Sequence, residues 1–205
     1  MAIPTGSNVQ IQLPVKVDYK VIDAFLEKKF QGKVLSKGKA NGETSDHAKI
    51  QHVSVEKSPL EDFDLALHLK LQLLTTFFRN KEIQLVVHLA LAFQEKTQEL
   101  SIQKYELDGE NNSWVINKLL ETLVNNFLYE KLKQKMKVDL KPILEKQTGK
   151  INEKLVNGTE IQQGIHLSGH VSKFSVNEII PGQKYLLVSL NLLSNNVVNI
   201  QELDF

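Results

Sequence analysis

Two long stretches of alternating apolar residues constrain the fold of this chain more than any other feature. In residues 63–74 the leucines at odd-numbered positions share one face, and residues 83–93 repeat the pattern. This period of two is typical of half-buried antiparallel strands. Both stretches exceed the average strand of about five to six residues. We therefore predict a long β-hairpin, with 77 opposite 83 and a three-residue connection at 79–81, so that both leucine faces lie on one side.

A long amphipathic pattern follows the hairpin and the strand predicted after it at 99–107. From Trp114 to Met136 apolar residues recur at helical spacing, which predicts a helix over 113–138, about 39 Å long. Pro142 is expected to break or kink this helix. Residues 140–156 then predict a second helical segment that ends at Asn157 and Gly158.

The N-terminal part predicts a strand and a short helix. Residues 8–17 alternate in polarity, and Pro14 indicates an edge position or a bulge. Asp18 is expected to cap a helix whose apolar residues extend to Phe30, with Gly32 ending it. Residues 33–46 predict mostly loop around a short strand.

The remaining segments also predict strands. In residues 47–57 the apolar positions change phase, which a β-bulge would produce. Near the C-terminus we predict three closing strands, separated by Pro181-Gly182 and by Ser194-Asn195-Asn196: 160–176, 184–192 and 197–202.

Composition excludes several classes of function. The chain has 205 residues, no cysteine, and 25 Lys+Arg against 24 Asp+Glu, so its net charge is +1. Disulfides, thiol nucleophiles and Cys-ligated metals are therefore absent, and no global field attracts nucleic acid. No stretch reaches the roughly 20 apolar residues that span a bilayer. Residues 1–6 show no export signal, so we expect either a cytoplasmic protein or one whose signal has been removed.

These elements together predict an α+β fold in one domain. One helix is only about 10 Å wide and cannot cover a flat sheet of such long strands. We therefore expect a long, strongly curved antiparallel sheet wrapped around the long kinked helix, with the shorter N-terminal helix beside it.

The order of elements resembles the tubular lipid-binding (TULIP) superfamily, which includes modules of bacterial envelope proteins. The stretches that carry the resemblance are Asp64-Leu65-Ala66-Leu67-His68-Leu69 and Tyr185-Leu186-Leu187-Val188-Ser189-Leu190. The resemblance implies a single TULIP-like domain over 1–205, or one module of a longer tandem protein. It also implies a hydrophobic groove for acyl chains, no catalysis, and a periplasmic or envelope-associated location.

We therefore expect a non-enzymatic carrier or sensor of lipid or another elongated apolar molecule. Each buried methylene contributes about 0.8 kcal/mol, so a chain of about ten carbons would bind with few polar contacts. The residues predicted to line the groove are Phe25, Leu69, Leu71, Leu85, Val87, Leu89, Leu123 and Phe127. The alternative is a structural or protein-interaction domain with a filled core. A lipid enzyme would require a Ser or Asp near the groove with a basic partner that the linear sequence hides.

No pattern in the sequence predicts a metal, a cofactor or catalysis. The motifs of hydrolases, zinc peptidases and nucleotide-binding loops are missing. His68 and His88 are placed on the polar face of the hairpin, too far apart to meet. The lysines Lys131, Lys133, Lys135 and Lys137 form a dense cationic run. This run would dock on acidic lipid headgroups, or it is a solvated helix face whose stems cover apolar surface.

Overall fold

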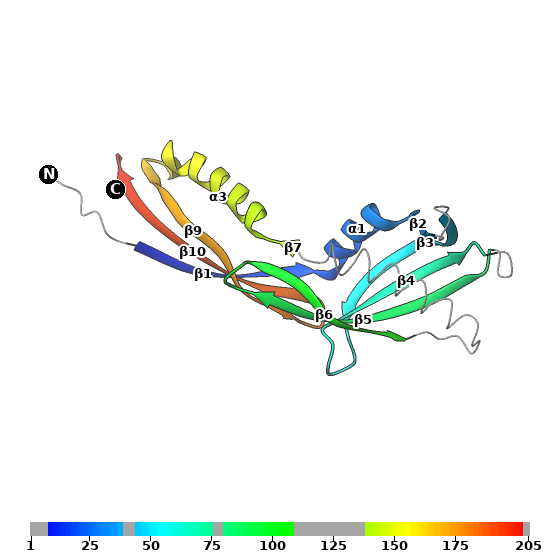
Figure 1. The fold of residues 1–205 in the computed structure, drawn as a ribbon. Coiled ribbons are helices and arrows are strands. Elements are labelled where there is room, and N and C mark those ends of the chain that lie inside the picture. Colours follow the sequence, from blue (N-terminus) through cyan, green and yellow to red (C-terminus); the bar gives the residue numbers. More distant parts are fainter. Residues whose placement is uncertain (1–7, 39–43, 76–79, 109–137, 203–205) are drawn as a thin grey trace.

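The computed structural model describes residues 8–38, 44–75, 80–108 and 138–202 of the chain. Their strands form two antiparallel sheets that curl along an elongated molecule (Figure 1). The described elements in chain order are β1 (Asn8–Asp18), α1 (Tyr19–Phe30), β2 (Val34–Gly38), β3 (Thr44–Lys57), β4 (Leu65–Leu73), β5 (Glu82–Gln94), β6 (Glu99–Asp108), β7 (Val138–Asp139), α3 (Lys141–Val156), β8 (Thr159–Gln162), β9 (Ile165–Pro181) and β10 (Tyr185–Ile200).

Sheet A has four strands in the order β1, β10, β9, β8. The predicted first strand is confirmed as β1, and it lies at an edge, where proline is tolerated because one row of backbone groups has no partner strand. β1 pairs with β10 along its whole length. At the other edge the short β8 pairs only with residues 165–167 of β9. The rest of β9 is therefore an edge without a partner strand among the described residues.

The predicted turn at Pro181-Gly182 is confirmed between β9 and β10, but the closing strands differ from the prediction at two other places. The first predicted strand is two strands, β8 and β9, because Gly164 with φ 69° makes a turn between them. β10 instead continues through Ser194-Asn195-Asn196 and pairs there with β9. A Cβ on Gly169 would lie 2.3 Å from the carbonyl oxygen of Asn195. The glycine thus lets the strands approach closely, and turn-forming residues stay in the ladder.

Sheet B has six strands in chain order from β2 to β7. The predicted hairpin is confirmed as β4 and β5, with Leu69 opposite Leu85 and Leu71 opposite Ile83, so the leucine faces lie on one side. The predicted register is wrong, because residue 83 pairs with 71 and not with 77. The connection is longer than three residues: the N–H of Asn80, at φ 64°, bonds to the carbonyl of Leu73 at 2.9 Å.

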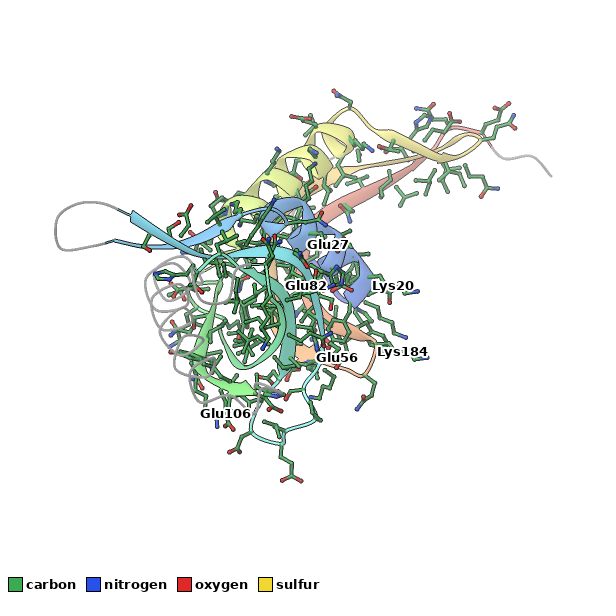
Figure 2. All side chains as sticks on the ribbon, turned by 90° about the vertical axis from the view of Figure 1, so that its right-hand side faces the viewer. Lys20, Glu27, Glu56, Glu82, Glu106 and Lys184 are labelled. Atoms are coloured by element: carbon green, nitrogen blue, oxygen red, sulfur yellow. The ribbon has the colours of Figure 1, made fainter. Side chains whose placement is uncertain are left out.

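The bulge predicted in residues 47–57 is confirmed by a register shift in β3 between Ile50 and His52. Such a bulge increases local twist. Figure 2, which looks at the molecule from the sheet B end, shows this sheet curled around a crowded interior of side chains.

The observed register of β4 and β5 brings two histidines closer together than the predicted register does. His68 lies opposite Val86 and His88 lies opposite Ala66, so the two are diagonal neighbours. His68 is partly exposed and bonds to Glu56 at 2.8 Å. His88 is buried, and its Nδ1 lies 2.9 Å from Ser58 Oγ. The reason is the loop before β4, which folds over this part of the polar face.

The described helices are short. α1 has 12 residues and begins directly after Asp18 as predicted, but the Asp18 side chain makes no capping hydrogen bond. The predicted segment at 140–156 is confirmed as α3, which has 16 residues. Pro142 lies in its first turn, where the missing N–H costs nothing. Pro142 therefore lies at the start of α3.

The predicted architecture of one long curved sheet wrapped around a long kinked helix is wrong. The strands divide between two curled sheets, and each described helix lies against one of them (Figure 1). The predicted helix over 113–138 falls almost wholly in 109–137, outside the described residues. The single-sheet expectation failed because alternation shows that a strand has an apolar face, not which strands share a sheet.

Candidate functional site

The residues predicted to line a groove lie mostly in the packed core of sheet B. Leu69, Leu71, Leu85, Val87 and Leu89 are all buried and belong to one cluster of contacting side chains. Ile22, Leu26 and Phe30 of α1 pack against that cluster. The structure therefore brings the five predicted strand residues together, in an interior where they contact one another and α1.

The three predicted helix residues do not join them. Phe25 is 60% exposed and is not among the α1 residues that pack against the cluster. Leu123 and Phe127 lie outside the described residues, as do the lysines predicted to contact membranes, Lys131, Lys133, Lys135 and Lys137.

One side of sheet A carries exposed apolar side chains on neighbouring positions of β1. On β1 the side chains of Ile11 and Leu13 are 44% and 50% exposed, and Val9 is exposed as well. Residues directly opposite one another in a ladder share a face. Ile11 therefore forms a row with Leu192 of β10 and Phe174 of β9. We call Val9, Ile11, Leu13, Leu190, Leu192 and Phe174 the open face.

Helix α3 covers only part of this face. Its main contact is with β9, where Leu144 is buried. Asn152 fixes the helix there, because its side-chain amide accepts the N–H of Val171 at 2.7 Å and donates to the Val171 carbonyl at 3.1 Å. One amide thus satisfies both backbone groups at the free edge of β9. β1 and β10 keep their apolar face exposed or half-buried.

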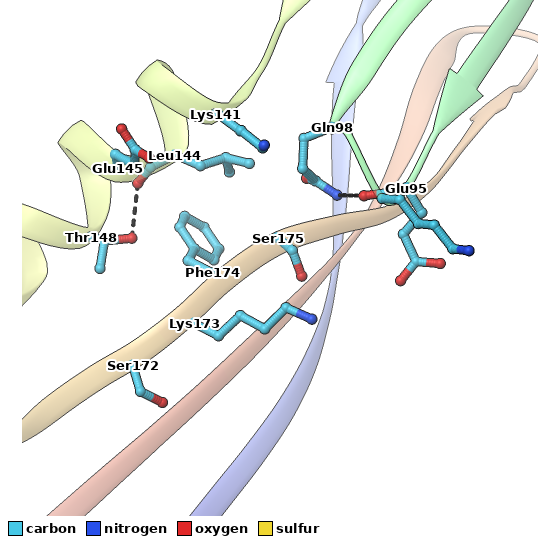
Figure 3. Close-up of a pocket in the computed structure, with 11 residues that line it drawn as sticks. Glu95, Gln98, Lys141, Leu144, Glu145, Thr148, Ser172, Lys173, Phe174 and Ser175 are labelled. Carbon is cyan, nitrogen blue, oxygen red and sulfur yellow. Dashed lines mark hydrogen bonds between the residues drawn. The ribbon is translucent and has the colours of Figure 1, made fainter.

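A pocket of about 630 Å³ adjoins the row that ends at Phe174. We call it the waist pocket, because it lies where the turn between β5 and β6 meets β9 and the start of α3 (Figure 3). Its lining comes from that turn, from α3 and from one stretch of β9: Glu95, Lys96 and Gln98; Lys141, Leu144, Glu145 and Thr148; and residues 172–175.

Gln98 holds the turn against β9. Its side-chain amide accepts the N–H of Val176 at 2.7 Å and donates to the Val176 carbonyl at 2.8 Å. The same NH₂ group donates to the Glu95 carbonyl at 2.6 Å. The Gln98 backbone carbonyl accepts the N–H of Leu140 at 2.9 Å. One buried residue therefore joins sheet B, sheet A and the segment that leads into α3.

Between the two amides, the edge of β9 has unpaired polar groups. Backbone groups of successive residues in an antiparallel pair point alternately toward and away from the partner. Val176 directs its N–H and C=O to Gln98, so Phe174 directs its own to the same free edge, and no hydrogen bond from a described residue reaches them. Ser175 is 6% exposed, and its Oγ has no hydrogen-bond partner among these residues.

The charges of the pocket are mixed. Three lysines and two glutamates line it, and none of them forms an ion pair with a described residue. Figure 3 shows Lys141 extending from the start of α3 toward Gln98, Lys173 extending along β9 on the other side of the strand from Phe174, and Glu145 beside Thr148 at the opposite end. The pocket is thus polar where it adjoins Gln98 and apolar at Leu144 and Phe174.

Ser58 has the basic partner that a lipid enzyme would require, namely His88. However, both residues are buried, and Ser58 Oγ also accepts the N–H of Leu60 at 3.1 Å. Neither residue lines the waist pocket or belongs to the open face. This geometry is that of a turn fixed by a serine hydroxyl.

The sequence reasoning missed the waist pocket entirely. The position of Asn152 could have been noticed in the sequence. Helical spacing places this polar residue on the same side of α3 as Leu144 and Thr148, which indicates a buried polar contact. Gln98 and Ser175 gave no such signal, since an amide in a turn and a serine in a strand are common on surfaces.

Within the described part of the chain, no helix is long and apolar enough to cross a membrane. The same residues contain no cluster of three or more His, Asp or Glu side chains placed to hold a metal ion.

Comparison with known proteins places almost the whole chain in one family. The model described as Domain of unknown function (DUF4403) matches residues 2–200. No curated protein and no solved structure matches the chain.

Proposed function

We propose that this chain, which belongs to the DUF4403 family, binds an elongated apolar molecule such as a lipid along the open face of sheet A. The family description assigns no function, so the proposal depends on the surface of this chain. It also moves the expected binding surface from the sheet B residues to sheet A.

The observation that carries the proposal is the uneven covering of two similar apolar faces. The sheet B face is buried by α1 and by its own side chains, whereas Ile11 and Leu13 of sheet A are about half exposed. Contiguous exposed apolar surface is uncommon on soluble proteins and marks sites of interaction or ligand binding. The row from Ile11 through Leu192 to Phe174 leads into a pocket, as a ligand site would.

The apolar row also supports a ligand that is long and narrow. Two interstrand spacings separate β1 from β9, about 10 Å. An acyl-type chain that lies across these strands would bury apolar surface against Ile11, Leu192 and Phe174. Each buried methylene would contribute about 0.8 kcal/mol to the binding free energy. Binding of this kind requires no catalytic group.

The test measures binding of the neutral apolar fluorophore N-phenyl-1-naphthylamine, together with organic extraction and native mass spectrometry of the purified protein. We expect saturable binding and a co-purifying apolar molecule. The variant Ile11→Glu should weaken fluorophore binding at least about tenfold, because it places a charge in the apolar row.

The matched control is Val21→Glu. Val21 is also an exposed β-branched residue, but it lies on α1 and not on the open face. It should bind the fluorophore like the unchanged protein. A protein that purifies empty and does not bind the fluorophore would contradict the proposal. Equal loss in both variants would also contradict it. A stable dimer that Ile11→Glu dissociates would instead support the alternative of an interaction domain.

A further inference from the structure

We infer that the waist pocket holds the negatively charged end of the ligand proposed above, a carboxylate or a phosphate ester on an acyl-type chain. This inference rests on the proposed function, because it assigns the second end of the same ligand. It specifies an anionic amphiphile, which the apolar surface alone does not.

Ser175 is the first observation that points to a polar ligand group. A buried hydroxyl without a hydrogen bond has lost its contacts with water and gained no partner in exchange. Ser175 Oγ is such a group, and Ser175 lines the pocket. An acceptor atom of a ligand placed in the pocket would give this hydroxyl its missing partner.

The edge of β9 supplies a second donor beside it. The register places the Phe174 N–H at the free edge between the residues bound by Asn152 and Gln98. Successive donors on neighbouring residues form small anion-binding surfaces in proteins. The donors here are a backbone N–H and the adjacent serine hydroxyl.

Two ammonium groups complete the polar end of the pocket. Lys141 comes from the first turn of α3 and extends toward Gln98, and Lys173 extends along β9 in the same direction, on the face of the strand opposite the Phe174 ring (Figure 3). Neither lysine has an ion-pair partner among the described residues. Hydrogen bonds between a charged donor and a carboxylate or phosphate are about twice as strong as neutral ones.

The pocket also has features that oppose an anion. Glu95 and Glu145 line it, and the Phe174 carbonyl shares the free edge. Glu145 lies at the end away from Lys173 in Figure 3. Glu95 is on the turn that carries Gln98, so it is the carboxylate that limits affinity. This arrangement predicts that Glu95→Gln binds an anionic ligand more tightly.

Phe174 connects the two ends of the ligand site. Its ring lies beside α3 at the pocket (Figure 3), and its strand position puts it in the same row as Leu192 and Ile11. A chain leaving the polar end would therefore pass the Phe174 ring and continue across the open face toward β1.

The experiment compares three competitors of equal chain length against bound N-phenyl-1-naphthylamine, below their micelle concentrations. Dodecanoate and dodecyl phosphate have the charged end, and dodecanol does not. We expect both anions to displace the fluorophore at concentrations at least about tenfold lower than dodecanol. Acetate, which has the carboxylate without the chain, should not displace it at those concentrations.

The variants test which residues produce the preference. The double variant Lys141→Met, Lys173→Met should reduce the preference for the anions to less than about threefold and leave dodecanol unchanged. Ser175→Ala should reduce it in the same direction. Lys154→Met, an exposed lysine of α3 outside the pocket, is the control and should keep the full preference.

The outcomes separate this inference from the proposed function. If dodecanol and dodecanoate displace the fluorophore equally well, the anionic end is refuted and apolar binding stands. If the double lysine variant keeps the preference, the anion lies elsewhere and the pocket assignment is refuted. Displacement of the fluorophore by acetate would show that the carboxylate suffices without an acyl chain, and would refute an amphiphilic ligand. A protein that does not bind the fluorophore contradicts the proposed function first, and the inference with it.

Discussion

At the residue scale, Gln98 and Tyr19 connect the two sheets. Gln98 has a positive φ of 56°, a backbone conformation that is costly for a residue with a side chain. Its five hydrogen bonds to Glu95, Val176 and Leu140 explain why the conformation is retained. The wall of the waist pocket therefore depends on one strained residue.

Tyr19 makes the second connection. Its ring belongs to the core cluster of sheet B, while its hydroxyl donates to the carbonyl of Gly182 in the turn between β9 and β10 at 2.8 Å. Burial, and to a lesser degree the negative charge of Asp64, raises the pKa of the Tyr19 hydroxyl above its usual value. The neutral form is therefore favoured in the folded protein.

This raised pKa predicts a loss of stability in alkali. Above pH of about 10, the usual tyrosine pKa, the unfolded chain loses the Tyr19 proton while the folded chain still holds it. The free energy of unfolding should therefore decrease as the pH rises from about 10 through the folded pKa. Urea denaturation from pH 8 to 11 would measure this slope in the unchanged protein and in Tyr19→Phe.

We expect the Tyr19→Phe variant to be about 1 kcal/mol less stable at pH 8, because it loses the bond to Gly182. Its stability should then depend less on pH above about 10. Identical slopes in the two proteins would show that Tyr19 does not control the alkaline transition.

At the element scale, each described helix covers the unpaired edge of a strand with a polar side chain. On α1, Asp23 Oδ1 accepts the N–H of Val55 in β3 at 2.7 Å. On α3, Asn152 binds both backbone groups of Val171 in β9. Exposed strand edges promote unwanted pairing with other chains. The helices therefore prevent such pairing at these points. On β9 the edge at Phe174 stays accessible, between Val171 held by Asn152 and Val176 held by Gln98.

The variant Asn152→Ala should release α3 from β9. It leaves the N–H and C=O of Val171 without partners, so we expect a loss of about 1–3 kcal/mol in unfolding free energy. Hydrogen exchange should be faster at the Val171 amide and along α3. The control Gln147→Ala removes an exposed amide from the same helix and should change stability by less than about 0.5 kcal/mol. Unchanged protection of the Val171 amide would contradict the role of Asn152.

At the scale of the whole molecule, the two sheets differ in what covers their apolar sides. Sheet B and α1 enclose a core in which Leu71 is 1% exposed. Sheet A has α3 over β9 and an open face toward β1 (Figure 1). The molecule therefore has one half with a packed core and one half with an exposed apolar surface.

Two leucine substitutions should separate these roles. Leu71→Ala leaves a cavity in the packed core, so it should lower the free energy of unfolding by about 2–5 kcal/mol. Leu13→Ala removes a half-exposed side chain and should cost about 1 kcal/mol or less, yet it should weaken fluorophore binding. Denaturation of ligand-free protein and fluorophore titration would measure both effects. Equal stability losses would mean that the open face is part of a core.

The sequence by itself determined the elements whose signals are local. The period of two in β4 and β5 set their facing leucine sides, and the phase change at Ile50 set the bulge in β3. The apolar spacing up to Phe30 set α1. These patterns depend on neighbours along the chain, so alternation and turn residues were enough.

Only the tertiary structure decided which of two similar apolar faces is covered. Ile11 and Leu13 alternate along β1 just as Leu69 and Leu71 do along β4, but only the latter lie beneath other side chains. The burial of a strand face depends on the element that lies across it, and the pattern along the strand contains no information about that element. The waist pocket arises for the same reason, because Gln98 and Ser175 are 77 positions apart in the sequence and meet only when the edge of β9 meets the turn of sheet B.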